Sequence, residues 1–113
     1  REIAASRGCE NLWEVRQETN AVRVDVELSA VLARAVEEEG LKALRLSSGA
    51  GHDAAQMATL VPVTMLFVRC EEGISHNPAE SVAREDVEVA LGVMQRFLGL
   101  IAEAHPTKER VGK

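Results

Sequence analysis

The sequence predicts an α/β fold, in which helices pack against a mixed β-sheet. Strand-like and helix-like segments alternate along the chain, which is the pattern of an α/β layer structure. Residues 63–68 form a near-continuous apolar run, typical of a strand that is buried on both faces. Residues 84–104 carry apolar side chains at helical spacing, and this is the clearest periodicity in the chain.

The first 23 residues predict the end of a helix followed by an irregular strand. Residues 1–7 resemble the tail of a helix that Gly8 stops, because glycine favours the C-terminal cap. From residue 9 to residue 23, apolar and charged residues alternate only in part, so a strand is expected over part of this segment. Trp13 is expected to pack against apolar neighbours rather than hold a ligand.

The next segment predicts a capped helix and a short strand. Asp25 is suited to cap a helix that runs to Glu39, with Gly40 just beyond its end. The acidic residues 37–39 are expected to be a solvated last turn rather than a functional cluster, and residues 41–46 follow as a short strand. The expected apolar face of this helix consists of Leu28, Val31, Leu32, Ala35 and Val36.

The second half of the chain predicts two more helices around the apolar strand. A short helix is expected from His52 to Leu60, because Pro62 blocks its continuation. The last helix is expected to end at His105 and Pro106, before a frayed basic tail at residues 107–113. Its expected core face consists of Val87, Ala90, Leu91, Met94, Phe97, Leu98 and Ile101.

Composition and charge exclude several classes of protein. Thirteen basic residues against 18 acidic residues give a net charge of −5, which argues against a nucleic-acid partner. A membrane span is not expected, since no apolar run approaches the roughly 20 residues that a bilayer requires, and no targeting leader is expected.

Cys9 and Cys70 are expected to be reduced, buried thiols of a cytoplasmic protein. The chain starts within an element and without Met, which predicts a piece of a longer protein.

A glycine-rich turn provides the first candidate site. Gly49, Ala50 and Gly51 precede His52 and Asp53. Glycine lets a ligand approach the backbone, and free amides at a helix start favour an anion or a carbonyl oxygen. On spacing alone, a plain tight turn in which Asp53 caps a helix is the favoured interpretation, so the turn by itself does not establish a site.

A polar loop provides the second candidate site. His76 is followed by Asn77, Pro78 and Glu80, and a neutral imidazole is a common metal ligand. Pro78 would stiffen the loop, and Glu80 or Asn77 could orient the ring. A single histidine in a polar loop is also often merely exposed. Both motifs follow predicted strands, where ligands of α/β sheets gather, so His52 and His76 are expected to face one cleft.

The two motifs resemble those of the peptidase M20 metallohydrolases. The matching residues are SGAGHDA at 48–54 and GISHNPAE at 73–80, with PVTMLFV at 62–68 between them. Within that family the sequence is most similar to the amidase/hydantoinase/carbamoylase branch. This branch contains N-carbamoyl-L-amino acid hydrolases, allantoate amidohydrolases and β-ureidopropionases.

The resemblance implies a C-terminal fragment of a two-metal hydrolase. Residues 1–23 would end a lid domain that mediates dimerisation, residues 24–106 would belong to the catalytic domain, and residues 107–113 would form a tail. His76 would bind one of two divalent metal ions (Zn, Mn, Ni or Co), and the general-base glutamate and the other ligands would lie upstream. The segment Gly49–His52 would contact a small-molecule substrate, with Asp53, Asn77 and Glu80 in supporting roles.

The implied reaction is attack of metal-activated water on a linear amide or ureido carbon. The full-length enzyme is expected to be a cytoplasmic homodimer, and the isolated fragment is expected to be inactive. Two alternatives are an M20 peptidase or N-deacylase, and a non-catalytic dimerisation or binding domain of the same fold.

Overall fold

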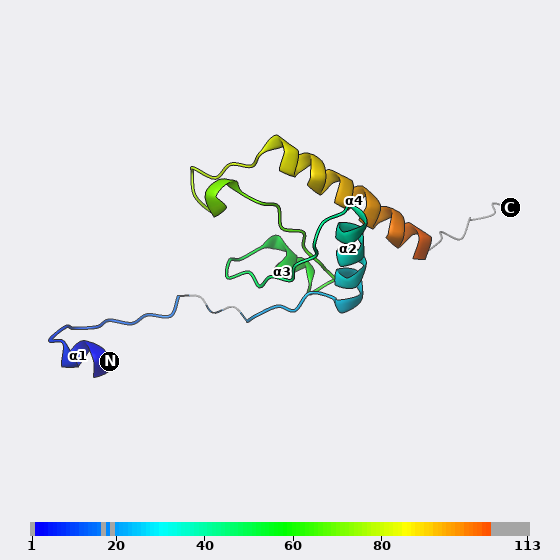
Figure 1. Cartoon of the computed structure of the whole chain (residues 1–113). Helices are drawn as coiled ribbons and strands as arrows, with labels where there is room; N and C mark the ends of the chain where they lie inside the picture. The colour runs from blue at the N-terminus through cyan, green and yellow to red at the C-terminus, as the bar shows by residue number, and fades with distance from the viewer. Residues whose placement is uncertain (1, 17, 19, 105–113) are drawn as a thin grey trace.

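Two helices, α2 and α4, form the centre of the computed structural model, which describes residues 2–16, 18 and 20–104. Along the chain the elements are α1 (Glu2–Ser6), α2 (Val26–Glu38), α3 (Asp53–Met57), the short 3₁₀ helix η1 (Glu71–Gly73) and α4 (Arg84–Ala104). Figure 1 shows that α4 runs across α2, while extended segments and loops link the shorter helices on one side. The described residues contain no β-strand, so the predicted sheet is not formed in this structure.

The core lies between α2 and α4. Its buried side chains are Leu32 and Ala35 of α2 and Val93 and Phe97 of α4. Leu28, Val31 and Val36 pack around them, together with Leu66, Leu100 and Ile101. The predicted apolar face of α2 is therefore confirmed.

The boundaries of α2 follow from its capping residues. The Asp25 carboxylate accepts a hydrogen bond from the Leu28 amide at 2.7 Å, and Gly40 takes a left-handed backbone with φ of 76° beyond the last turn. The predicted cap and stop are both confirmed. The acidic last turn has an additional structural role, because Glu38 and Glu39 form ion pairs with Arg96 of α4 at 3.3 and 2.7 Å.

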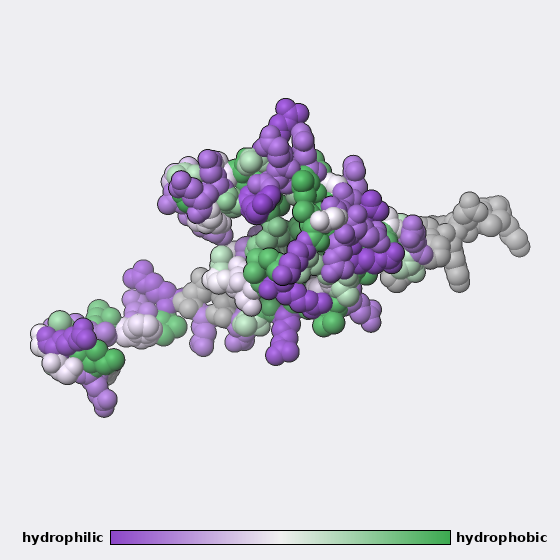
Figure 2. Space-filling view, in the orientation of Figure 1, coloured by the Kyte–Doolittle hydropathy of each residue, from purple (hydrophilic) through white to green (hydrophobic). Residues whose placement is uncertain are grey.

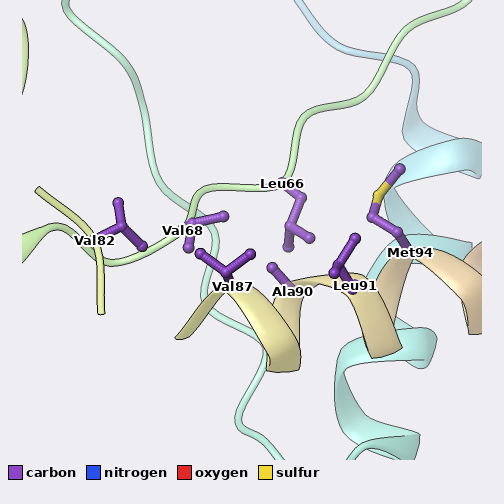
Figure 3. A pocket seen from close by; sticks show the side chains of 7 residues that line it. All are labelled: Leu66, Val68, Val82, Val87, Ala90, Leu91 and Met94. Atoms are coloured by element: carbon purple, nitrogen blue, oxygen red, sulfur yellow. The ribbon is translucent and has the colours of Figure 1, made fainter. Parts of the chain in front are cut away.

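The bounds of α4 agree with the prediction, and its buried face agrees in part, because Phe97 and Ile101 of the predicted face belong to the core whereas other members do not. Val93 and Phe97, one turn apart, lie against α2, while Leu91 and Leu98 are each 58% exposed. The helix thus presents a face rotated from the predicted one, because α2 is the element that covers it. Leu91 and Met94 instead line an open apolar groove of about 400 Å³ with Leu66 and its neighbours. In Figure 3 the side chain of Leu66 points from the extended segment toward α4.

The segments predicted as strands are extended but form no ladder. Residues 41–46 and 63–68 have no regular secondary structure, and Phe67 is 45% exposed. The predicted burial of residues 63–68 on both faces is therefore wrong for this structure. A strand is stable only when its amides and carbonyls pair with a neighbour. Here the Asp25 amide donates to the Val63 carbonyl at 2.8 Å, and no further bridge extends that pair among the described residues.

The N-terminal residues form an arm that extends away from the helix pair. Helix α1 is followed by Gly8 with φ of 66°, as predicted, and then by an extended segment that forms no strand. The molecule measures 76 × 38 × 23 Å, and Figure 2 shows hydrophobic and hydrophilic residues side by side on the arm. Trp13 is 75% exposed, so the predicted packing role is wrong.

Three remaining predictions concern the chain end, membranes and thiols. The predicted helix stop at His105 and the tail at residues 107–113 lie outside the described residues. Within the described ranges, no helix has the length and apolar character that crossing a membrane would require. Both cysteines are free, but Cys9 is exposed and Cys70 is half-buried, so the prediction of buried thiols is wrong.

Candidate functional site

The structure brings the two candidate motifs together. The imidazole rings of His52 and His76 lie with their centroids 6.2 Å apart and their planes at 66°. The Phe67 ring lies beside His52, with its centroid 6.1 Å from the centroid of the imidazole. His52 is half-buried and His76 is exposed. Two histidines separated by 24 positions in the chain therefore share one surface.

The glycine-rich turn is closed by a serine side chain. The Ser48 hydroxyl oxygen lies 2.6 Å from Nε2 of His52 and accepts a hydrogen bond from the Ala50 amide at 3.1 Å. Neither Gly49 nor Gly51 adopts a left-handed φ, and a Cβ atom at either position would meet nothing within 4 Å. The fold of this chain therefore does not itself require glycine there. A ligand that lies directly against the backbone would require it.

The helix after this turn differs from the prediction. It begins at Asp53 and ends at Met57, rather than running to Leu60, and His52 occupies the N-cap position. Asp53 is the first residue of α3 and is not its cap, and no side chain caps this helix. A helix of five residues has too few aligned peptide dipoles to attract an anion strongly. The Ala50 amide is already bonded to Ser48, so the open amides of the predicted set are those of Gly49 and Gly51 among the described contacts.

The His76 loop is held by two polar side chains. The Glu80 carboxylate accepts a hydrogen bond from the His76 amide at 2.9 Å and lies 3.4 Å from the Ser75 hydroxyl. The Asn77 side chain accepts one from the Ala79 amide at 2.9 Å. Glu80 and Asn77 thus hold the loop backbone, whereas the sequence predicted that one of them orients the imidazole. His76 has a left-handed backbone with φ of 55°, and its amide rather than its ring meets Glu80.

Cys70 adjoins this loop. Its thiol lies 3.6 Å from the Glu80 carboxylate, to which it donates a weak hydrogen bond. Burial raises the pKa of Cys70, and the hydrogen bond to Glu80 and the negative charge of Glu80 raise it further. The thiol therefore stays protonated at neutral pH and is a poor nucleophile.

The described residues do not complete a metal centre. They contain no group of three or more histidine, cysteine, aspartate or glutamate side chains that could hold a metal ion. His76 offers one exposed imidazole, and a stable site needs several ligands. A metal ion bound at His76 would need its other ligands from residues outside this part of the chain.

Two contacts of the site were not predicted. Ser48 bonds to His52, and a serine four residues before a histidine across a glycine turn is a usable signal for that contact. The Phe67 ring lies beside His52, and the alternation of a strand does not indicate which side chains meet across a loop.

Comparison with known proteins places these motifs in a family. Residues 10–99 match the model of peptidase family M20/M25/M40. The chain is 44% identical over 94 residues to the allantoate deiminase of Arabidopsis thaliana, covering 75% of this chain and 18% of that protein. It is 34% identical over 101 residues to the N-carbamoyl-L-amino acid amidohydrolase of Geobacillus stearothermophilus, covering 89% of this chain and 25% of that protein. No solved structure matches.

The chain belongs to the M20/M25/M40 peptidase family, and membership of this family indicates an α/β fold. A third relative is the allantoate amidohydrolase of Escherichia coli K12, which is 43% identical over 92 residues, covering 81% of this chain and 22% of that protein. The chain therefore spans about a fifth to a quarter of the length of these curated relatives.

Proposed function

We propose that this chain forms part of the active site of an amidohydrolase that cleaves a linear amide or ureido C–N bond. The substrate class is an N-carbamoyl-L-amino acid or an allantoate-like compound, which is the class that the names of the relatives indicate. The observation that carries this proposal is the meeting of the two motif histidines, His52 and His76, on one surface. Side chains that only served packing would have no reason to gather beside an open glycine turn.

The roles of the residues follow from their surroundings. His76, exposed on a loop that Glu80 and Asn77 hold, is proposed to supply one ligand to a pair of divalent metal ions (Zn, Mn, Ni or Co). The open backbone of residues 49–51 and the His52 side chain are proposed to contact the substrate, and Asp53 supports this turn. In the complete enzyme, residues 1–23 would form the end of a lid domain that mediates dimerisation. That enzyme would be a cytoplasmic homodimer. The remaining ligands and the general base would come from other parts of that enzyme.

The experiment that tests this proposal has two parts. The 113-residue chain, incubated with Mn²⁺ and N-carbamoyl amino acids, is expected to show no turnover, because one imidazole cannot hold a catalytic metal pair. In the complete enzyme, His76→Ala is expected to lower the bound metal measured by elemental analysis. His52→Ala is the matched control, which should keep the metal and weaken substrate binding. Unchanged metal content in His76→Ala would show that His76 is not a metal ligand. Turnover by the 113-residue chain alone would show that it holds a complete active site.

A second candidate function is peptide-like amide hydrolysis, as in an M20 peptidase or N-deacylase. The family description favours it, since the matching model is named for peptidases. Comparing hydrolysis of N-carbamoyl and N-acetyl amino acids by the complete enzyme separates the two. Preference for the N-acetyl compounds would favour the deacylase.

A further inference from the structure

We infer that Ser48 is a positioning residue that holds His52 in its Nδ1–H tautomer, so that His52 donates a hydrogen bond to a substrate oxygen and does not bind metal. This inference rests on the proposed function for the identity of the substrate and on the geometry of the turn for the tautomer. It assigns different tasks to the two neighbouring histidines: His76 provides a lone pair, and His52 provides a proton donor.

The first step concerns the hydroxyl of Ser48. Its oxygen accepts the Ala50 amide proton at 3.1 Å, so that bond does not use the hydroxyl proton. Two acceptors are within reach of the proton: Nε2 of His52 at 2.6 Å and the Ala50 carbonyl oxygen at 3.5 Å. Hydroxyl hydrogen bonds have donor–acceptor distances of about 2.5–3.0 Å. Of these two acceptors only Nε2 lies at such a distance, so the proposed arrangement has the hydroxyl donate to Nε2.

The second step concerns the imidazole of His52. A neutral imidazole has one protonated nitrogen and one acceptor nitrogen, and the bond made by one nitrogen sets the state of the other. With Nε2 accepting from Ser48, the proton of the neutral ring is on Nδ1. The lone pair of Nε2 is then occupied and Nδ1 has none free, so His52 has no nitrogen available to a metal ion.

The third step concerns what keeps this arrangement in place. The His52 ring makes edge contacts with Phe67 at 6.1 Å and with His76 at 6.2 Å between centroids, and it is half-buried. A ring packed in this way cannot rotate freely to exchange its two nitrogens. The His76 ring, by contrast, has no hydrogen bond to any side chain or backbone group that the structure describes, and its nitrogens remain open to a ligand.

The chemistry of the ligand follows from this division. A fixed N–H donor beside the open amides of Gly49 and Gly51 matches an oxygen acceptor, namely a carboxylate or a ureido carbonyl oxygen. Both groups occur in N-carbamoyl amino acids. His52 and the glycine backbone would then bind the same end of the substrate.

The tautomer is tested by ¹⁵N NMR of the 113-residue chain labelled at histidine, recorded at about pH 8.5, well above the ordinary histidine pKa of about 6.5. His52 in the unaltered chain is expected to show the Nδ1–H pattern. Ser48→Ala should shift it toward the Nε2–H pattern, whereas Ser48→Thr, which keeps the hydroxyl, should restore Nδ1–H. Ser47→Ala is the matched control and should change nothing, and the His76 signals serve as an internal reference. An Nε2–H pattern in the unaltered chain overturns the inference even if Ser48→Ala fails to fold.

The donor role is tested in the complete enzyme with two isosteric variants. The side-chain amide of His52→Asn places an N–H near the position of Nδ1, and that of His52→Gln places one near Nε2. The kcat/KM of His52→Asn is expected to be at least about tenfold higher than that of His52→Gln, because losing one hydrogen bond to the substrate costs about that factor. Bound metal should be equal in the two variants. Equal or reversed kinetics would overturn the donor role, and loss of metal from both would show that His52 is a ligand. Should the unaltered enzyme fail to hydrolyse ureido substrates, the proposed function falls and the NMR result still decides the tautomer.

Discussion

At the scale of single residues, the Glu80 carboxylate links the thiol of Cys70 to the backbone of His76. One oxygen lies 3.6 Å from the thiol sulfur and the other accepts the His76 amide at 2.9 Å. Burial is the first cause of the raised pKa of Cys70, and Glu80 adds to it through a hydrogen bond and its negative charge. The same carboxylate thus stabilises a loop and suppresses a nucleophile.

Replacing Glu80 by Gln is expected to make Cys70 react faster. The variant removes the negative charge, which lowers the pKa of the thiol and increases the thiolate fraction at pH 8. The measurement is the rate of alkylation by iodoacetamide in a Cys9→Ser background, where Cys70 is the one remaining thiol. Glu72→Gln, a nearby exposed carboxylate without a contact to the thiol, is the control. Equal rates in the two variants would show that Glu80 does not act on Cys70.

At the scale of elements, a small cluster of charges joins the end of α2 to α4. Arg96 of α4 lies 2.7 Å from Glu39 and 3.3 Å from Glu38, and Arg34 lies 2.7 Å from Glu38. The hydrogen bond from Arg34 is the largest cause of the lowered pKa of Glu38, and Arg96 adds to it. Burial acts in the opposite direction.

The stability of the helix pair is expected to depend on pH through this cluster. A carboxylate whose pKa is lower in the folded state contributes stability above its ordinary value of 4.5, and loses it as the pH falls through the lowered value. Arg96→Gln should therefore lower the urea midpoint at pH 7, and its difference from the unaltered chain should shrink as the pH falls below 4.5 toward the lowered pKa of Glu38. Arg45→Gln, on an exposed segment, is the control. A difference that persists at low pH would show that Arg96 acts by packing.

The rotated face of α4 gives a second prediction at this scale. Phe97 is 8% exposed against α2, whereas its neighbour Leu98 is 58% exposed. Phe97→Ala should cost about 3–5 kcal/mol, the usual loss for a buried phenylalanine. Leu98→Ala should stay within about 0.5 kcal/mol, as for surface positions. Urea unfolding followed by circular dichroism measures both. Similar losses in the free energy of unfolding would mean that Leu98 is buried, as the sequence predicted.

The elements that the sequence predicted well are those whose signals are local. Asp25 and Gly40 mark the ends of α2, and apolar spacing marks the length of α4. The face that α4 buries and the pairing of residues 63–68 depend on which distant segment lies beside them, and spacing along the chain does not contain that information. In the site, the approach of His52 to His76 was predicted, although the strands expected to carry them there are not formed among the described residues, whereas the Ser48 hydroxyl bond depends on the exact path of a turn.

At the scale of the whole molecule, the chain has two parts that contribute unequally to stability. Its radius of gyration is 20.5 Å, against about 13 Å for a compact chain of 100 residues. The excess comes from the arm before α2, which Figure 1 shows extending away from the helix pair. The buried side chains all belong to α2 and α4 within the described ranges.

Removing residues 1–20 is therefore expected to leave the free energy of unfolding unchanged within about 0.5 kcal/mol, the range of surface changes. Among the residues of this segment that the structure describes, the deletion removes exposed side chains such as Leu12, at 98% exposure, and no core contact. Chemical denaturation of the shortened and complete chains compares the two. A loss larger than about 1 kcal/mol would mean that the arm packs on the helix pair in solution.

The left-handed backbone at His76 has a practical consequence for anyone who wants to remove its imidazole. With φ of 55°, this position penalises most side chains, and asparagine tolerates it better than alanine does. An alanine there would relax the chain path as well as delete the ring, and two effects would be mixed in one measurement. The metal test with His76→Ala is therefore paired with His76→Asn, because asparagine removes the imidazole while leaving the amide where Glu80 receives it.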